Sequence, residues 1–205
     1  RVVPETYPHF LANQWGSPYR TERIYRVLEN GRKFSAQDML ALQMDTYSEF
    51  DRIMANAFVY AVDHARNASD RARRAADLMR GWNGYVEIDA VAPTIATRAR
   101  RKLWKLLLEP RLGGDWERYQ WFSSSVAMER LVQSKPQRWL PPGFADWNSL
   151  LTKAVEDAVA DPGAPRDLAA WQWGKNSPIV LQHPLFGDIP FLNRFSGPGT
   201  WPQSG

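Results

Sequence analysis

The side chains in this sequence that most readily carry chemistry are its three histidines and one run of serines. His9, His64 and His183 stand far apart and show none of the spacings of zinc sites, so we expect no metal site formed by this chain. The run from Ser123 to Ser125 lacks the Gly-x-Ser-x-Gly setting of a nucleophilic serine, and we interpret it as a loop. The sequence contains no cysteine, which excludes a thiolate nucleophile. These residues by themselves predict no complete catalytic centre.

Four basic residues share one face of a predicted helix. They are Arg98, Arg101, Lys102 and Lys105, with Trp104 beside them. Their i, i+3 and i+4 spacing forms a basic face that could bind a nucleic acid or a membrane surface. A solvated face is the simpler interpretation, because acidic residues are plentiful elsewhere in the chain. The alternative function that this face supports is a non-catalytic helical interaction module that binds an acidic partner.

A tryptophan-rich segment near the C-terminal end is the second unusual feature. Trp171 and Trp173 are one residue apart, so in an extended segment both would point to the same face. Gly174 directly after them would let another backbone approach closely. The apolar run at 179–181 predicts a short buried strand, which Pro184 would close.

Apolar residues that recur every three or four positions predict the helices that must position these groups. The first spans 19–28, with Asn30-Gly31 as its stop. Ser35 and Asp38 have the spacing of a capping box, and behind them we expect the longest helix, over 35–61. Its buried face would carry Met39, Leu42, Phe50, Ile53 and Phe58.

Further helices are expected over 70–80, from Pro93 to about 108 with a stop before Pro110, over 116–121, over 126–132 and around 150–159. The segment 85–89 is ambiguous between strand and loop. We therefore predict a mainly α fold, with at least half of the residues in helices. A few short strands should lie mainly within 170–181. Within a single fragment at 1–205, a helical region at 19–163 would precede a Trp-rich strand and irregular tail at 164–205.

The composition is that of an ordinary globular chain, with 44% hydrophobic and 23% charged residues among 205. A net charge of +4 is too weak to indicate nucleic-acid binding by itself, and no apolar run is long enough to span a membrane. Ten tryptophans imply large buried aromatic surfaces. The chain begins with arginine and ends in a loop composition, so we expect it to be a piece of a longer polypeptide.

Five segments, taken together and in order, resemble the penicillin acylase (penicillin amidase) family of N-terminal nucleophile hydrolases. The resemblance covers nearly the whole chain. The segments are Tyr7-Pro8 with Trp15-x-x-Pro18-Tyr19-Arg20-x-x-Arg23-Ile24; Phe34 to Met39 with Leu42-Gln43-x-Asp45; Gly81-Trp82-Asn83-Gly84; Trp171-x-Trp173-Gly174-Lys175 with His183-Pro184-Leu185; and the Gly-rich stretch 197–205.

The resemblance implies an enzyme that cleaves a carboxamide bond through an acyl-enzyme on an N-terminal serine. That serine's own α-amine would be the base, with a pKa of about 7.7 to 8.0, and an asparagine would stabilise the oxyanion. Both groups would lie outside this chain, which would be an internal segment of the large chain and inactive alone. The segment would be the helical part of an αββα hydrolase.

Arg20 matches an arginine that lies near the nucleophile in this family, so the resemblance implies a supporting role in catalysis. Trp15, Gln43, Asp45, Trp82, Trp171, Trp173, Gly174 and His183 would be structural motif residues. Two departures stand out: Ser177 replaces a histidine that the family often has, and no acid lies at 9–14, where the family draws a calcium ligand.

The resemblance also indicates the surroundings of the chain. Calcium would bind, if at all, outside this segment, which itself needs no cofactor. The partners would be the remaining chains or segments of the same self-processing precursor and a small acyl amide, with no nucleic acid and no membrane. The complete protein would be periplasmic or secreted. The choice of acyl group is not readable from these residues.

Overall fold

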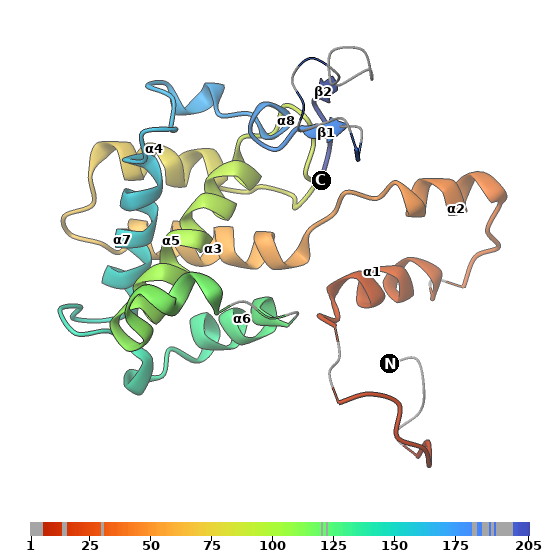
Figure 1. The fold of residues 1–205 in the computed structure, drawn as a ribbon, viewed down its shortest axis with the longest axis horizontal. Coiled ribbons are helices and arrows are strands. Elements are labelled where there is room, and N and C mark those ends of the chain that lie inside the picture. The colour runs from red at the N-terminus through yellow and green to blue at the C-terminus, as the bar shows by residue number, and fades with distance from the viewer. Residues whose placement is uncertain are drawn as a thin grey trace.

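Helices make up most of the molecule (Figure 1). The computed structural model describes residues 6–13, 16–29, 31–119, 121, 123–181, 184–185, 189, 191 and 199–205. This described part is 58% helical and contains two short strands. The prediction of a mainly α fold with at least half of the residues in helices is therefore confirmed. No helix within these ranges is both long enough and apolar enough to cross a membrane.

Four helices build the core of a helical body. They are α3 (Glu49–Asp63), α4 (Asp70–Met79), α5 (Ala92–Leu112) and α7 (Trp147–Val159). Large apolar side chains from all four are fully buried between them, including Phe58, Met79, Leu103 and Leu150. Buried alanines on the same faces let the helix axes approach closely. Each fully buried leucine or phenylalanine contributes about 1.5–3 kcal/mol to the free energy of folding.

Shorter elements surround this core. The helical ones are α6 (Ser124–Ser134), α8 (Trp173–Asn176) and the 3-10 turns η1 (Gly113–Arg118), η2 (Gln137–Trp139) and η3 (Leu168–Ala170). Strands β1 (Ile179–Leu181) and β2 (Gly199–Trp201) pair antiparallel, with Ile179 opposite Trp201. This small ribbon lies beside α8 (Figure 1).

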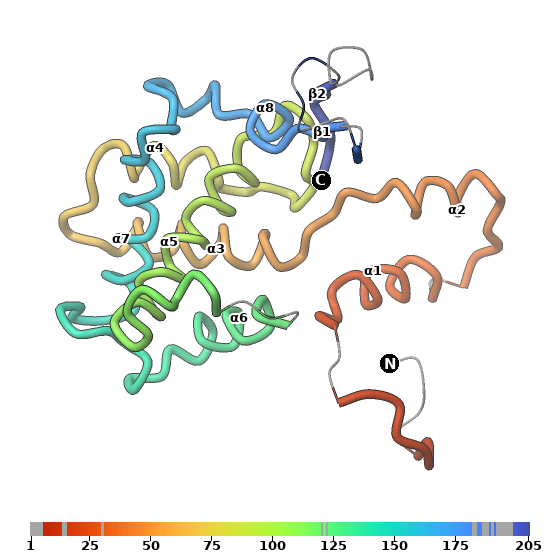
Figure 2. Tube along the Cα trace, viewed as in Figure 1, coloured from red at the N-terminus to blue at the C-terminus, as the bar shows by residue number. Residues whose placement is uncertain are grey.

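Two helices form an arm beside the body. α1 (Tyr19–Leu28) and α2 (Ala36–Gln43) carry no buried residue, and Figure 2 shows them standing apart from the core helices. Apolar side chains of the arm remain open, such as Leu40 at 49% and Met44 at 72% exposure. Apart from Tyr19, whose ring packs against the core, burial of apolar surface within the described chain does little to fix the position of the arm, which depends chiefly on polar contacts at its base.

Local sequence signals predicted several boundaries correctly. α1 spans the predicted residues, and α4 covers 70–79 of the predicted 70–80. The capping box before α2 is present: the Asp38 amide donates to Ser35 Oγ at 3.2 Å, and the Ser35 amide donates to Asp38 Oδ2 at 2.8 Å. These features depend on contacts three residues apart, which the sequence contains directly.

The prediction of one helix over 35–61 is wrong. The structure has α2 and α3 there, separated at 44–48, because the Asp45 carboxylate accepts the Tyr47 amide at 3.0 Å and Ser48 begins a new capped helix. Three residues of the predicted buried face are open or partly open: Met39 is 39% exposed, and Leu42 and Ile53 are half-buried.

The longest helix is α5, and it continues through Pro110 rather than stopping before it. Pro110 lies in the last turn, where it removes one backbone hydrogen bond. The buried side chains of Leu107 and Leu108 hold this turn against the body, and Arg111 Nη1 donates to the Leu107 carbonyl at 2.8 Å. Tertiary packing here outweighs the local cost of proline.

The prediction of an extended strand for the tryptophan segment is wrong, because the segment joins two short helical turns. Trp171 follows η3 and Trp173 is the first residue of α8. The strand at 179–181 exists, but its residues are 40%, 61% and 53% exposed rather than buried. Its partner β2 lies in the tail that was predicted to be irregular.

Leu150→Ala should lower the free energy of unfolding by about 2–5 kcal/mol, because it empties a fully buried site between α7 and its neighbours. Leu181→Ala is the matched control: its side chain is 53% exposed, and we expect a change within about 0.5 kcal/mol. Urea unfolding of both variants measures the difference, and equal losses would contradict this description of the core.

Candidate functional site

Arg20, for which the family resemblance implies a supporting role in catalysis, is the second residue of α1 and is exposed. Its guanidinium has no hydrogen-bond or ion-pair partner within the described part of the chain. Two predicted motif residues, Trp15 and His183, lie outside the described residues. Gln43 is the exposed last residue of α2.

The start of α1 is fixed by its first residue. The Tyr19 hydroxyl donates to Glu129 Oε2 of α6, and the Tyr19 ring stacks on Phe50 of α3 at 5.5 Å between centroids. Burial, together with the bond to the Glu129 carboxylate, raises the pKa of Tyr19 well above its usual range. The hydroxyl therefore stays protonated and remains a donor at physiological pH.

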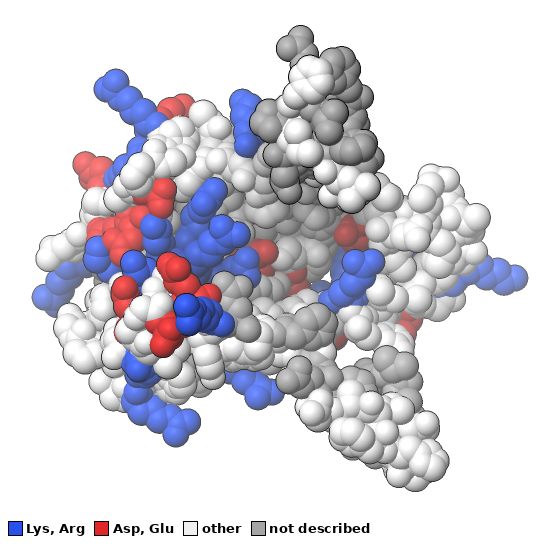
Figure 3. All heavy atoms as spheres, viewed as in Figure 1, with Lys and Arg blue, Asp and Glu red and all other residues white. Residues whose placement is uncertain are grey.

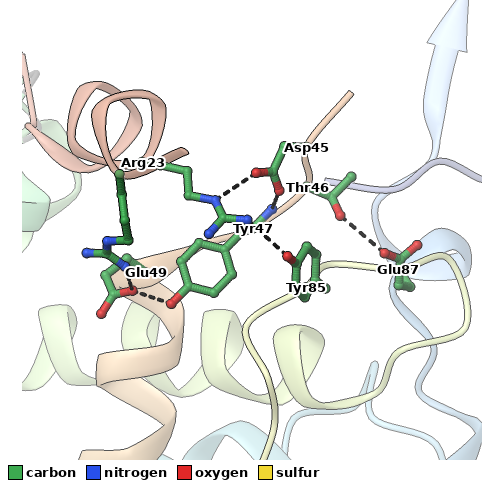
Figure 4. A network of polar contacts seen from close by, with 8 residues as sticks. Arg23, Asp45, Thr46, Tyr47, Glu49, Tyr85 and Glu87 are labelled. Atoms are coloured by element: carbon green, nitrogen blue, oxygen red, sulfur yellow. Dashed lines mark hydrogen bonds and ion pairs between the residues drawn. The ribbon is translucent and has the colours of Figure 1, made fainter. Parts of the chain in front are cut away.

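Arg23, one turn after Arg20, ties α1 to two other segments (Figure 4). Its Nε donates to Asp45 Oδ2 at 2.7 Å and its Nη2 donates to the Tyr85 hydroxyl at 2.9 Å. The guanidinium also lies over the Tyr47 ring, 4.5 Å from the centroid. Because the Arg23 and Asp45 side chains are only 24% and 12% exposed, this pair is partly desolvated. It fixes the rotation of α1 about its axis and thereby sets the direction in which Arg20 points.

We call the contacts among Arg23, Asp45, Tyr47 and Tyr85 the joint of the arm. Asp45 and Tyr47 lie at its middle. One oxygen of the Asp45 carboxylate binds Arg23, and the other accepts the Tyr47 amide. The Tyr47 hydroxyl donates to Glu49, which also accepts from Arg52 at 3.0 Å. Burial alone would raise the pKa of Glu49, but the bonds from Tyr47 and Arg52 outweigh it, and the pKa is lowered. Glu49 is therefore an ionised anchor and not a proton donor.

The segment 84–90 is the surface on which the joint is built. The Ser48 amide donates to the Gly84 carbonyl at 2.8 Å, and the Val86 amide donates to the Thr46 carbonyl at 3.2 Å. Tyr47 and Tyr85 face each other as an antiparallel bridge. The same segment was predicted as a strand or a loop, and the described structure gives it this single bridge.

The break at 81–84 shapes the start of that segment. Trp82 Nε1 donates to the Tyr85 carbonyl at 2.9 Å, and Asn83 Oδ1 accepts the Tyr85 amide at 3.0 Å. Gly84 has φ of +90°, and a Cβ there would lie 2.6 Å from Tyr47 Cε2. Glycine is required at this position both by its backbone angle and by the ring that covers it.

The tryptophan segment docks on the other part of 84–90. The Trp173 amide donates to the Ala90 carbonyl at 2.8 Å, and the Gly174 amide donates to the Ile88 carbonyl at 2.8 Å. A Cβ on Gly174 would lie 2.7 Å from Ile88 Cγ2, which explains the glycine in the Trp-Gly-Lys triplet. Trp171 is 2% exposed, and its Nε1 donates to Asn176 Oδ1 at 3.0 Å.

A groove of about 450 Å³ opens between the arm and this joint. Residues of both charges line it: Arg23, Arg32, Asp38, Asp45 and Glu87. Arg23 is paired with Asp45, and Arg32 is paired with Asp38 at 2.9 Å. The charged groups are thus mostly engaged with one another, an arrangement that joins segments rather than one that poises a free acid or base for catalysis.

The segments that meet here are the ones on which the sequence resemblance depends, and comparison with known proteins agrees. The model of the penicillin amidase family matches residues 1–205. The chain belongs to the penicillin amidase family. It is also 26% identical over 206 residues to an acyl-homoserine lactone acylase, QuiP, of Pseudomonas syringae pv. syringae (strain B728a). That match covers 85% of this chain and 24% of the relative, so the chain spans about a quarter of the relative's length.

In this member of the penicillin amidase family, the sequence identified the segments but not the way they join. Arg23, Tyr47 and Tyr85 carry the joint, and none was predicted as a site residue. The signal available was Arg23 itself, a second arginine one turn after Arg20 on the same helix. Its partner Asp45 is 22 residues away, a separation that no local pattern specifies.

Gly84→Ala should destabilise the protein by about 1–3 kcal/mol more than Gly143→Ala. Both glycines have φ of +90°, but a Cβ at Gly143 meets nothing within 4 Å, so the difference isolates the clash with Tyr47. Thermal and urea unfolding measure the two losses. If the losses were equal, the close approach of Tyr47 to Gly84 would not contribute to stability.

Proposed function

We propose that this chain is a scaffold and active-site-support segment of an acylase-type amide hydrolase. The reaction would pass through an acyl-enzyme on an N-terminal serine that this chain does not supply. The observation that carries the proposal is the family match over all 205 residues. The acylase named among its relatives supports the same class of reaction.

The reaction requires a base, donors for the oxyanion and rigid support for both from the assembled enzyme. The serine hydroxyl needs a base, which its own α-amine can be at neutral pH, with a pKa of about 7.7 to 8.0. The tetrahedral oxyanion needs preorganised donors, such as backbone amides and an asparagine side chain. These groups in turn need rigid support, and support is the part that we assign to this helical segment of an αββα hydrolase.

Arg20 is the residue through which the segment would reach the reaction. The helix dipole disfavours a cation at the start of a helix by about 0.3 kcal/mol or more. Local structure therefore gives no reason for an arginine at position 20. Its exposed guanidinium stands on a helix whose rotation Arg23 and Tyr19 fix. We propose that it faces the catalytic serine and the oxyanion asparagine and binds one or both through its planar fork.

The basic helix face supports the alternative of an interaction module only weakly. Lys102 Nζ is paired with Asp161 at 2.8 Å, and Lys105 Nζ lies 3.7 Å from Glu109. Half of the face is therefore neutralised by its own neighbours. We place the complete acylase in the periplasm or outside the cell, produced by self-processing of a precursor, with the remaining segments of that precursor as partners.

The proposed activity is tested with the full-length polypeptide that contains this chain and with the isolated 205-residue chain. We expect the full-length protein to hydrolyse a chromogenic acyl amide or an acyl-homoserine lactone and the isolated chain to hydrolyse neither, since the nucleophile would be missing. Release of amine from each substrate is the measurement. Activity of the isolated chain would refute the support role, and an inactive, fully processed protein would refute the hydrolase.

Arg20→Lys in the full-length protein should lower kcat by about 100-fold while the thermal midpoint stays nearly unchanged. A point charge cannot replace two parallel hydrogen bonds from a planar group. Arg26→Lys is the matched control on the same helix, since that side chain is 56% exposed and makes one ion pair of 3.5 Å. Near-normal kcat for Arg20→Lys would make Arg20 an ordinary surface residue.

A further inference from the structure

A small cavity lies between α5 and α8, away from the joint of the arm. Its volume is about 50 Å³. α5 contributes Thr94, Thr97, Arg98 and Arg101, and the segment 173–177 contributes Trp173, Asn176 and Ser177. The two parts of the sequence that looked unusual, the basic face and the tryptophan segment, therefore meet here. Figure 3 shows lysine and arginine side chains gathered over α5 on this face of the molecule.

Three of these residues carry buried polar atoms without a partner in the described part of the chain. They are the hydroxyl oxygens of Thr94 and Thr97 and the indole Nε1 of Trp173. Thr94 is 2% exposed. A buried polar group that makes no hydrogen bond is destabilising, so three around one cavity indicate that the cavity holds something that binds them.

The cavity presents more groups that can only donate than groups that can only accept, and the hydroxyls of Thr94, Thr97 and Ser177 can do either. The indole N–H and both guanidinium groups donate and cannot accept. Both polar atoms of the Asn176 side chain already have a partner: Oδ1 accepts the Trp171 indole N–H at 3.0 Å and Nδ2 donates to the Gln172 carbonyl at 2.8 Å. No aspartate or glutamate lines the cavity within the described residues.

The two arginines differ from the lysines of the same face. Lys102 and Lys105 have carboxylate partners, whereas Arg98 and Arg101 have no hydrogen-bond or ion-pair partner among the described residues. Asp161, the acid near Arg98, is bound by Lys102, and that bond, followed by the Gly163 amide, holds the pKa of Asp161 below its usual range. Arg98 and Arg101 are one helical turn apart and repel each other unless an anion lies between them.

The volume limits what can bind. A single water needs about 10–15 Å³ of such space, so the cavity accommodates a group of roughly three or four heavy atoms. A carboxylate group fits this size, and its two oxygens accept several hydrogen bonds at once. A nucleotide, an aromatic acyl chain or a sugar is too large.

We propose that the cavity between α5 and α8 is a binding site for one carboxylate group, held by Arg98, Arg101 and the Trp173 indole. The ligand is either a free small carboxylate or the side chain of an aspartate or glutamate from another part of the same protein. Both present the same oxygens to the same donors. None of the lining residues is Arg20 or Arg23, and the test below does not require acylase activity.

The test measures the thermal midpoint of the native full-length protein at low ionic strength, with sodium acetate against sodium chloride at equal ionic strength. A free-ligand site predicts a saturable rise of the midpoint with acetate beyond that with chloride. Arg98→Gln should weaken acetate binding by about tenfold or more, and Trp173→Phe should weaken it several-fold. Lys105→Gln removes the same charge from the same helix outside the cavity and should leave acetate binding unchanged.

If a side chain of the protein itself fills the site, acetate has no effect beyond chloride. Arg98→Gln and Trp173→Phe then each lower the midpoint more than Lys105→Gln does, and their losses are not additive, because both act on one carboxylate. Thr97→Val removes a hydroxyl at nearly constant volume. Its loss in thermal midpoint should likewise be non-additive with the losses of Arg98→Gln and Trp173→Phe. The proposal is overturned if acetate and chloride are equivalent and these losses are additive or no larger than that of Lys105→Gln.

Discussion

The backbone of residues 84–90 is the constraint on which the arrangement of the other segments depends. Its carbonyls at Gly84, Ile88 and Ala90 accept amides from two distant parts of the chain. The Val86 amide donates to Thr46, and the Val86 carbonyl accepts the amide of the last residue, Gly205, at 3.0 Å. A short irregular segment thus connects the arm, the tryptophan segment and the C-terminal residue through backbone hydrogen bonds, as a central strand of a sheet would.

These close backbone contacts explain why glycines stand where other segments meet 84–90. Segments approach 84–90 from two directions, and each approach is close enough that a Cβ on Gly84 or on Gly174 would overlap a neighbouring side chain. The core helices need no such feature, because interdigitating side chains set their spacing. The chain therefore divides into a body held by apolar burial and a set of outer segments held by hydrogen bonds to one loop.

That division also decides what could be predicted from the sequence. The helices of the body and the cap at Ser35 depend on periodicity and on contacts three or four residues apart, so the sequence contains their signals. The break at Asp45 was missed although the Asp45–Tyr47 bond is local, because apolar residues on both sides of it continue a helical period. The prediction that Trp171 and Trp173 lie in an extended strand was wrong, because two aromatic residues one position apart do not distinguish a strand from the start of a helix. The site was the least predictable part: Arg23 meets Tyr85 across 62 positions, and only the fold brings them together.

The distribution of charge on α5 follows from the same geometry. Lys102 and Lys105 carry compact ammonium groups on flexible stems. Lys102 reaches the Asp161 carboxylate, and Lys105 reaches the Glu109 carboxylate. Arg98 and Arg101 project where α8 closes over the first turns of α5, and the Trp173 indole is brought to the same place by the bonds of α8 to Ile88 and Ala90. The loop that positions the arm at one end therefore also positions, at its other end, the Trp173 donor of the proposed carboxylate site. A displacement of 84–90 would move both, so the two sites are linked through one segment of backbone although they share no side chain.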